Sequence, residues 1–495
     1  MSRSISHHPV LRRQAAVAQR RGELANPACQ IGPGQTCRHP LVDEALNTEL
    51  HRYETTISQR FLLIESALKK ISAIQHDDSF VQSAQDICQA MLGYCLPEDK
   101  LASAWVNGLD MPDLHAYCVF QSLVLSVQKA NEDRAIWLEK LPLSAPVLRD
   151  MGYHTVNISP CADGRLQGLL PFILRISPAP EISVKAFAGA RFDIEDDIAD
   201  WTQAELQRFA NEQGYDASLN YLKCVVYHYS SSVPCGEGCA AHGSNDDMAI
   251  DCAIEGLSNL QAAIRNLYGV GAEPDGLVLG VDTDTDALRV HLPDGSGTIH
   301  AHQFLDSAQL FADTLPLSGA QAEHVLIDRV RAACSNPDAN TVALAIGLLR
   351  ANFSQLQYVI EHHNGRYTDV GHDEKFICAG EAVASLHLRN KYYFAHLSTV
   401  EEGAADLDVG IKIFTSLNLS RGLAIPILVH FFFDARVSGA RQRAEERCHR
   451  VKQAIQSRYQ ALHERHQIRC FLAVSDIGGT ENVTPVPSSY SAAVH

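Results

Sequence analysis

A five-residue turn, Cys-Ala-Asp-Gly-Arg at residues 161–165, constrains the fold of this 495-residue chain more than any other feature. An apolar, β-branched run at residues 155–158 precedes the turn, and a second apolar segment at residues 166–174 follows it. A functional site in an open α/β sheet usually lies where a strand ends and the next element begins. The turn therefore predicts an α/β domain with a site at the end of a strand.

The residue types in this turn suit a metal site. The Cys161 thiolate is a ligand that zinc prefers, and a carboxylate two residues away would also bind zinc unless another group restrained it. Arg165 can restrain Asp163 through a two-pronged, charge-assisted hydrogen bond. The turn thus contains a candidate ligand, a candidate base and a restraint for that base.

A second strand end offers further ligands. Residues 222–227 are apolar and β-branched, which is typical of a buried strand, and His228 follows them. A loop then leads to Cys235 and Cys239. Cys161, His228 and one later cysteine would form a Cys₂His zinc site with an open fourth position, the catalytic arrangement. Spacing alone leaves zinc binding open, because the ligands are far apart in sequence and buried structural cysteines are common.

Four segments resemble those of a known family, the carboxysomal carbonic anhydrases, which are an epsilon-class, diverged branch of the β-class carbonic anhydrases. The segments are VNISPCADGRLQG at 156–168, EGCAAHGSND at 237–246, GVDTDTD at 280–286 and TVEEGA at 399–404. The resemblance runs from about residue 40 to the C-terminus. It implies one Zn²⁺ per chain, held by Cys161, His228 and Cys239, with Asp163 and Arg165 as the catalytic pair.

The ligand spacing departs from that of ordinary β-class enzymes, which place the His and the second Cys three residues apart. Here His228 and Cys239 are eleven residues apart, and Cys235 between them is the competing ligand. Cys239 is favoured because its Glu-Gly-Cys context is the ligand context of the family. His242 is a weaker rival to His228 as ligand and a candidate proton relay.

The resemblance implies a zinc-dependent carbonic anhydrase, a lyase that interconverts bicarbonate and CO₂ by attack of zinc-bound hydroxide on CO₂. Asp163 would accept a hydrogen bond from the attacking oxygen, and Arg165 would hold Asp163 in place. The enzyme would supply CO₂ to Rubisco in the lumen of the carboxysome, within the bacterial cytoplasm. The alternative is a non-catalytic carboxysomal scaffold in which a fourth sulfur, such as Cys235, closes a structural zinc site. A zinc deaminase is disfavoured, because the Pro-Cys-x-x-Cys part of its signature is absent.

The length of the chain suggests about three domains. Residues 1–40 contain six arginines and one glutamate, so they carry a net charge of +5, and the rest of the chain carries −22. We expect a disordered basic tail at 1–40, an all-helical domain at 41–138, a catalytic zinc-binding α/β domain at 139–385 and a degenerate C-terminal repeat of the catalytic domain at 386–495.

Two patterns support this division. Apolar residues recur at steps of three and four from Leu46 to Ile71, with Asp43 as a helix cap, and further helical patterns cover 80–92 and 114–127. Residues 425–431 echo 222–228, and residues 470–476 echo 277–282, which indicates a duplicated fold. The second copy has His430 but lacks the Cys-x-Asp-x-Arg turn, so it cannot complete a zinc site. The resemblance implies one active and one inactive half.

Composition and resemblance together limit the partners. The acidic body argues against nucleic acid, no apolar run is long enough to span a membrane, and the N-terminus lacks a signal-peptide core. The fourteen cysteines show no disulfide spacing. The resemblance implies a homo-oligomer built on dimers, contact with the carboxysome shell, and tethering to Rubisco through the N-terminal tail, whose paired arginines at 12–13 and 20–21 would meet acidic surfaces.

Two other clusters are interpreted as surface features. Asp282, Asp284 and Asp286 resemble the start of a calcium loop, but Ala287 and Pro293 stand where that loop requires Gly and Glu. A solvated turn after a strand is the better interpretation. Residues 361–364 and His372 lack ordered metal-ligand spacing and are interpreted as surface turns.

Overall fold

The computed structural model describes residues 38–104, 108–210, 219–231, 238–333, 339–367, 371–383, 389–397, 400–478 and 482–487. For residues 133–137 and 400–405 only the helical backbone is described. Nearly all of the expected tail and the cysteines at 29, 37 and 235 lie outside the described residues. What the sequence predicts for them therefore stays a prediction.

The N-terminal region is helical, as predicted. Its elements are α2 (Glu44–Ala73), α3 (Phe80–Leu92), α4 (Glu98–Ala102) and α6 (Met111–Trp137). The predicted stripe from Leu46 to Ile71 is buried along α2, and the Asp43 side chain accepts a hydrogen bond from the Leu46 backbone at 3.0 Å. The helix therefore begins at the predicted cap, and its apolar face packs inward.

A six-stranded mixed sheet follows, in the order β2-β1-β3-β4-β5-β6. The strands are β1 (Tyr153–Pro160), β2 (Ile182–Val184), β3 (Asn220–Tyr229), β4 (Asp275–Asp282), β5 (Leu288–His291) and β6 (Leu305–Asp306). The first four are parallel to one another, and β5 runs antiparallel to its neighbours β4 and β6. The carboxyl ends of β1, β3 and β4 therefore meet at one edge, which confirms the α/β class of this domain.

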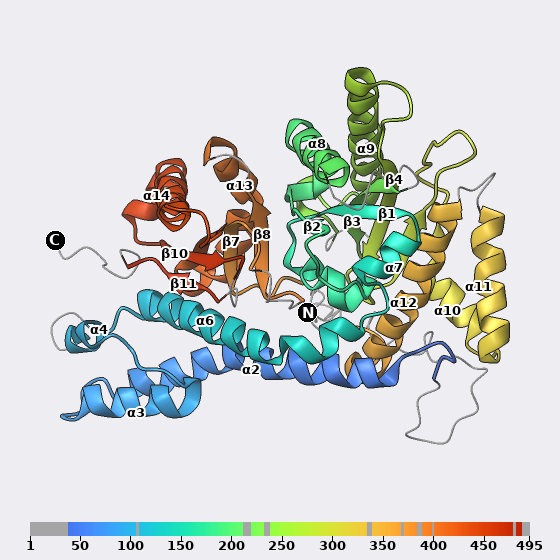
Figure 1. Ribbon diagram of the computed structural model, residues 1–495. Helices are drawn as coiled ribbons and strands as arrows, with labels where there is room; N and C mark the ends of the chain where they lie inside the picture. The colour runs from blue at the N-terminus through green and yellow to red at the C-terminus, as the bar shows by residue number, and fades with distance from the viewer. Residues whose placement is uncertain are drawn as a thin grey trace, which may run out of the picture.

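Helices cover this sheet. Figure 1 shows α8 (Ile194–Ala210) and α9 (Asp246–Tyr268) together on one side. On helix α8, the apolar side chains of Leu206 and Phe209 are exposed. Helices α10 (Ser307–Thr314), α11 (Gly319–Ala333) and α12 (Ala339–His363) come after β6, and α10 and α12 contact β5.

A second, five-stranded sheet has the order β11-β10-β9-β7-β8. Its strands are β7 (Phe376–Gly380), β8 (Tyr392–His396), β9 (Ile425–Phe433), β10 (Ile468–Asp476) and β11 (Thr484–Pro485), with α13 (Val400–Leu417), α14 (Ala440–Arg458) and α15 (Gln460–Glu464) beside them. Strand β7 lies inside the range 139–385 that the sequence assigned to the catalytic domain, yet it pairs in this second sheet.

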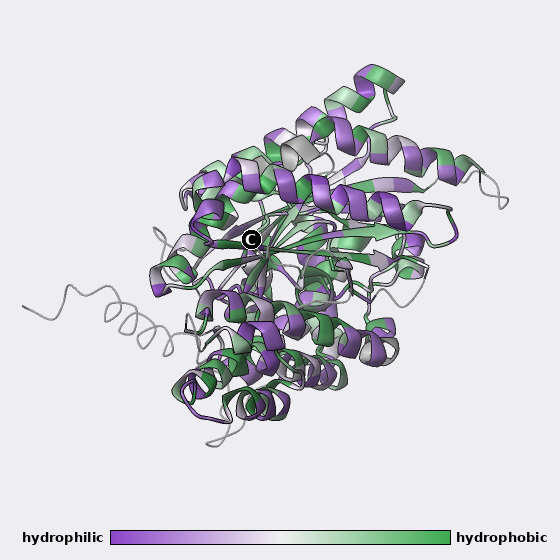
Figure 2. Cartoon of the chain, turned by 90° about the vertical axis from the view of Figure 1, so that its left-hand side faces the viewer, coloured by the Kyte–Doolittle hydropathy of each residue, from purple (hydrophilic) through white to green (hydrophobic). Residues whose placement is uncertain are grey.

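The long helices tie the two sheets together. Helices α2 and α6 run beneath both sheets in Figure 1, and α6 contacts β9 and β10 while α2 contacts α12. The Phe120 ring on α6 stacks on Phe471 of β10 at 4.7 Å. Figure 2 shows hydrophobic strands at the centre of the molecule and helices of mixed hydropathy around them. Among the described residues, no helix has the length and apolar character of a membrane span.

The sheets also meet edge to edge. The Phe394 backbone N–H of β8 donates to the Ala162 carbonyl at 3.0 Å, and the His396 N–H donates to the Ala186 carbonyl at 2.9 Å. The edge strand of the second sheet thus hydrogen-bonds directly to the turn at 161–165 and holds it against the first sheet.

Candidate metal centre

Cys161, His228 and Cys239 come together at the carboxyl edge of the first sheet. Cys161 directly follows β1, His228 lies near the end of β3, and Cys239 precedes a 3₁₀ turn at Ala240–His242. One ligand atom from each lies within 4.8 Å of the others, and all three side chains are buried. The fold therefore brings together the three residues that the sequence singled out as metal ligands.

The distance between the two sulfurs suits a zinc ion. The Sγ atoms of Cys161 and Cys239 are 3.8 Å apart, and both cysteines are free thiols. Two thiolates bound tetrahedrally at a Zn–S distance of about 2.3 Å would be separated by about 3.8 Å. A disulfide requires about 2.0 Å. The pair is thus spaced for a shared tetrahedral ion.

His228 completes a ligand set. Its side chain is fully buried, yet neither ring nitrogen has a hydrogen-bond partner among the described residues. Buried polar groups are nearly always hydrogen-bonded, so two unsatisfied imidazole nitrogens need an explanation. A metal ion bound by one of them supplies it, because a neutral imidazole is a common zinc ligand.

One thiol donates its proton to the other in a hydrogen bond between the two sulfurs. Their mutual hydrogen bond, together with burial, raises the pKa of Cys161 well above its ordinary value, whereas the same bond lowers the pKa of Cys239. A divalent cation would replace that proton and stabilise both thiolates, so metal binding is expected to release protons.

Asp163 and Arg165 form a tightly bonded pair beside these ligands. Arg165 donates from Nε to Asp163 Oδ1 at 2.9 Å and from Nη2 to Oδ2 at 2.8 Å. Its backbone N–H also donates to Oδ1 at 2.9 Å. Burial alone would raise the pKa of Asp163, but the charge and hydrogen bonds of Arg165 together with the neighbouring histidines hold that pKa well below its usual range. Asp163 is therefore a restrained carboxylate.

Glu374 supports the same turn from outside it. Its Oε1 accepts from the Gly164 backbone N–H at 3.2 Å, and the Asn390 N–H donates to the Gly164 carbonyl at 2.6 Å. A Cβ at residue 164 would lie 2.4 Å from Glu374 Cγ. Glycine is therefore required at residue 164, because the Glu374 side chain occupies the space of a side chain there.

Sequence reasoning missed Glu374 and misplaced His372. The interpretation of His372 as a surface turn is wrong, because its ring lies within 4.8 Å of ligand atoms of Asp163 and Glu374. His372 Nδ1 lies 2.9 Å from Glu374 Oε1, while 22% of its side chain stays exposed. Burial opposes protonation of His372, but the charges of Asp163 and Glu374 prevail and raise its pKa.

His242 does not join the cluster. Its Nε2 lies 3.0 Å from the Gly189 carbonyl and its Nδ1 lies 3.3 Å from Arg191 Nη2. Both ring nitrogens are thus engaged, which disfavours His242 as a metal ligand and as a proton relay.

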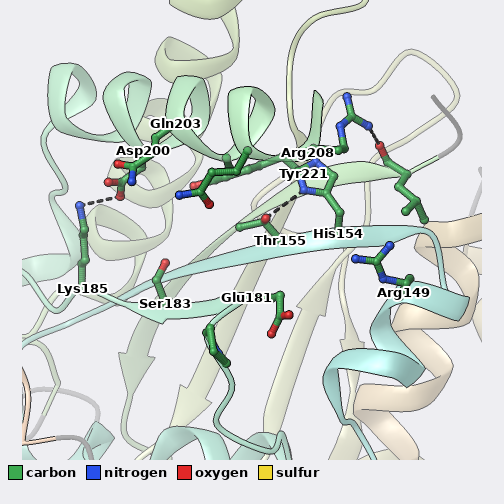
Figure 3. Close-up of a pocket in the computed structure, with 14 residues that line it drawn as sticks. Arg149, His154, Thr155, Glu181, Ser183, Lys185, Asp200, Gln203, Arg208 and Tyr221 are labelled. Carbon is green, nitrogen blue, oxygen red and sulfur yellow. Dashed lines mark hydrogen bonds and ion pairs between the residues drawn. The ribbon is translucent and has the colours of Figure 1, made fainter. Parts of the chain in front are cut away.

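A cavity of about 490 Å³ lies elsewhere, between β2 and α8 (Figure 3). None of the three candidate ligands lines it. Several of its charged side chains bind one another or the backbone: Lys185 pairs with Asp200 at 2.5 Å, and Arg208 donates to the Leu219 carbonyl. The candidate chemistry therefore lies at the carboxyl edge of the sheet and not in this cavity.

Family models match most of the chain. The catalytic-domain model described as Carboxysome Shell Carbonic Anhydrase matches residues 144–372. The C-terminal model of the same description matches residues 373–490, and the N-terminal model matches residues 39–131.

Curated relatives with the same description match this chain over most of their length. A carboxysome shell carbonic anhydrase from Halothiobacillus neapolitanus is 40% identical over 470 residues, which cover 92% of this chain and 91% of the relative. Another, from Prochlorococcus marinus, is 41% identical, with 94% of this chain and 91% of the relative covered. A third, from Hydrogenovibrio crunogenus, is 37% identical, with 86% and 82% covered. The chain belongs to the family of carboxysome shell carbonic anhydrases.

Proposed function

We propose that this carbonic anhydrase interconverts CO₂ and bicarbonate with one zinc ion held by Cys161, His228 and Cys239, inside the carboxysome in the bacterial cytoplasm. The observation that carries the proposal is the buried Cys-His-Cys cluster with a restrained carboxylate beside it. Zinc at such a site would ionise a water molecule near neutral pH and so supply the hydroxide that attacks CO₂.

The role of Asp163 follows from its hydrogen bonds. Because Arg165 occupies both carboxylate oxygens from one side, Asp163 is held ionised and oriented. It can accept a hydrogen bond from the attacking oxygen and so direct a lone pair towards CO₂. Arg165 acts through Asp163 as a positioning residue.

His372 is the best-placed residue to carry the released proton to solvent. It lies beside Asp163 on one side, is partly exposed on the other, and is oriented by Glu374. A histidine with a raised pKa can accept and release a proton within the cellular pH range.

We expect His372→Ala to slow CO₂ hydration by about 10²-fold in dilute buffer, as loss of a proton-transfer group does. Stopped-flow assays at increasing imidazole concentration should restore much of the rate, because the small base replaces the missing ring. His324→Ala, on the exposed side of α11, is the control. An equal loss at every buffer concentration would show that His372 only positions Asp163.

The competing scaffold proposal needs a fourth ligand. Among the described residues, the cluster with Cys161 contains only the three side chains named above, which leaves a fourth position open. Cys235, the predicted competitor, lies outside the described residues. A stopped-flow CO₂ hydration assay on zinc-loaded protein decides between them, because a closed structural site would leave the hydration rate at that of buffer.

The topology supports the proposed duplication. The order β2-β1-β3-β4-β5 in the first sheet is matched by β8-β7-β9-β10-β11 in the second. Corresponding pairs also run in the same sense: three parallel pairs and then one antiparallel pair. Each half thus repeats one strand scheme, which is the expected result of a fold resembling the β-class carbonic anhydrases that occurs twice in one chain.

The register changes one detail of the predicted repeat. The Cys161 N–H donates to the Val226 carbonyl, and the Glu381 N–H donates to the His430 carbonyl in the second sheet. His430 therefore corresponds to Val226 and not to His228, and Glu381 stands in the place of Cys161. The second half therefore lacks the cysteine and the histidine at the positions that correspond to Cys161 and His228, which supports the proposal that it is inactive.

Within the carboxysome we propose that the enzyme supplies CO₂ to Rubisco and is tethered to it by the basic tail. Contact with the shell and assembly into a dimer-based oligomer are further proposals. Disordered segments bind weakly per contact and gain strength from many copies.

Deletion of residues 1–37 should leave CO₂ hydration unchanged and abolish co-precipitation with Rubisco. The cut spares His39, which is buried against Phe311 and Phe353. Binding by the full-length protein should weaken as salt rises, because charge pairs are screened. Undiminished binding by the truncated protein would exclude the tether.

A further inference from the structure

The sequence suggested that the aspartates at the end of β4 form a solvated turn. The structure shows that they are buried. Asp282, Asp284 and Asp286 are 3%, 0% and 0% exposed. Their oxygens bind protein donors, so this aspartate turn (residues 282–286) is an anchor for neighbouring chain segments.

Asp282 holds the segment that follows β3. Its Oδ1 accepts from the Ser231 backbone N–H at 3.1 Å, and its Oδ2 accepts from the Ser231 hydroxyl at 2.7 Å. Thr285 also donates its hydroxyl to Oδ2 at 2.7 Å. Both main chain and side chain of Ser231 are therefore fixed to one carboxylate.

Asp284 holds the preceding residue as well. The Ser230 hydroxyl donates to its Oδ2 at 3.2 Å, and the Ser231 hydroxyl donates at 3.3 Å. Arg366 forms an ion pair with the same carboxylate. The carboxylates of Asp282 and Asp284 thus accept hydrogen bonds from the consecutive residues Ser230 and Ser231.

These serines occupy a decisive place in the chain. They come two and three residues after His228 and lie on the only covalent path from His228 to Cys239. Their anchoring fixes the main chain directly after His228, at the end of β3.

Asp286 reaches the other ligand-bearing segment. It accepts from Arg389 Nε at 3.3 Å, and Arg389 also donates to the Thr283 carbonyl. The next residue, Asn390, donates its N–H to Gly164 in the turn that carries Cys161. The aspartate turn therefore connects to the residues after His228 and to the turn that carries Cys161.

We infer that the aspartate turn is a positioning element of the zinc site, in which Asp282 and Asp284 fix the residues directly after His228 and Asp286 supports the segment that contacts the Cys161 turn. The inference rests on the proposed zinc function. Burying neighbouring carboxylates is costly: burial and the charge of Asp284 raise the pKa of Asp282 to about 6. A turn that only had to close a strand would not need such an arrangement.

The test compares zinc retention in Asp282→Ala and in Asp294→Ala. Asp294 also accepts hydrogen bonds from its own turn, from Ser296 and Thr298, but it touches neither cysteine-bearing segment. We expect zinc transfer from Asp282→Ala to a colorimetric chelator to be at least about tenfold faster than from wild type, and transfer from Asp294→Ala to be unchanged. The cobalt-substituted protein should show an altered visible spectrum in Asp282→Ala alone.

Ser231→Ala keeps the test valid if Asp282→Ala fails to fold, because it removes one hydroxyl and leaves both carboxylates. It should also speed zinc release. The double variant should speed zinc release by less than the sum of the two single effects, since both changes break the contact between Ser231 and Asp282 and only the longer bond to Asp284 is lost in addition. Asp282→Asn, which keeps an acceptor for the Ser231 N–H, should recover part of the retention.

The outcomes separate this inference from the zinc proposal. A wild-type protein that binds no zinc would overturn the proposed function. A wild type that binds zinc, together with Asp282→Ala and Ser231→Ala variants that release it at the wild-type rate, would overturn the positioning role alone. A lowered melting temperature with an unchanged cobalt spectrum would have the same meaning, because the turn would then only stabilise the fold.

Discussion

Replacement of Cys161, His228 or Cys239 with alanine is expected to abolish zinc retention and CO₂ hydration together. Each change removes one of three ligands in a buried cluster, and two protein ligands do not hold zinc in a catalytic site. Zinc content by mass spectrometry of metals and stopped-flow hydration, measured on the same preparations, check the result. Circular dichroism should show that each variant retains its secondary structure.

The control for this series is Cys235→Ala, which should retain about one zinc per chain if Cys239 is the ligand. Cys252→Ala is a second control, because this half-buried cysteine on α9 belongs to no metal cluster among the described residues. Loss of zinc from Cys235→Ala, with zinc retained by Cys239→Ala, would reverse the ligand assignment.

Replacement of Arg165 with alanine is expected to give a folded, zinc-loaded and inactive protein. Asp163 Oδ2 already lies 3.5 Å from His228 Nε2. Without the two hydrogen bonds from Arg165, the carboxylate can rotate towards the metal and take the position that water needs. Stopped-flow hydration and zinc content should therefore diverge in this variant, unlike in the ligand variants.

Two companion variants sharpen this prediction. Asp163→Ala leaves the fourth position open and should slow hydration by about 10²–10⁴, as loss of a positioned base does. Arg165→Lys keeps the charge but cannot form the paired hydrogen bonds, so it should recover only part of the rate. Near-normal turnover by Arg165→Ala would exclude the restraint. Its melting temperature should fall, because a buried carboxylate loses its partner.

Local patterns predicted the parts of the fold that depend on local physics. The stripe on α2 and its Asp43 cap follow from helical periodicity and from the unsatisfied N–H groups of a first turn. Strands β3 and β4 follow from the short apolar runs at 222–227 and 277–282, and each strand begins two residues before its run. The turn at 161–165 was found because ligand, base and restraint lie within five residues.

Features made by distant contacts escaped sequence reasoning. Glu374 reaches Gly164 across 210 positions in the chain, and no periodicity signals such a contact. Asp282 and Asp284 look like surface residues because carboxylates rarely become buried without partners. Their partners, Ser230, Ser231 and Arg366, are ordinary polar residues whose proximity appears only in the folded structure.

The contacts between β8 and the turn at 161–165 have a consequence for how this region can vary. The Phe394 backbone N–H of β8 donates to Ala162 in the turn, the Asn390 N–H just before β8 donates to Gly164 in the turn, and the His396 N–H donates to Ala186 after β2. Every residue except proline supplies such a group. Side chains at these positions can therefore be substituted without loss of the backbone hydrogen bonds. Proline is the one substitution that removes the N–H donor at any of them.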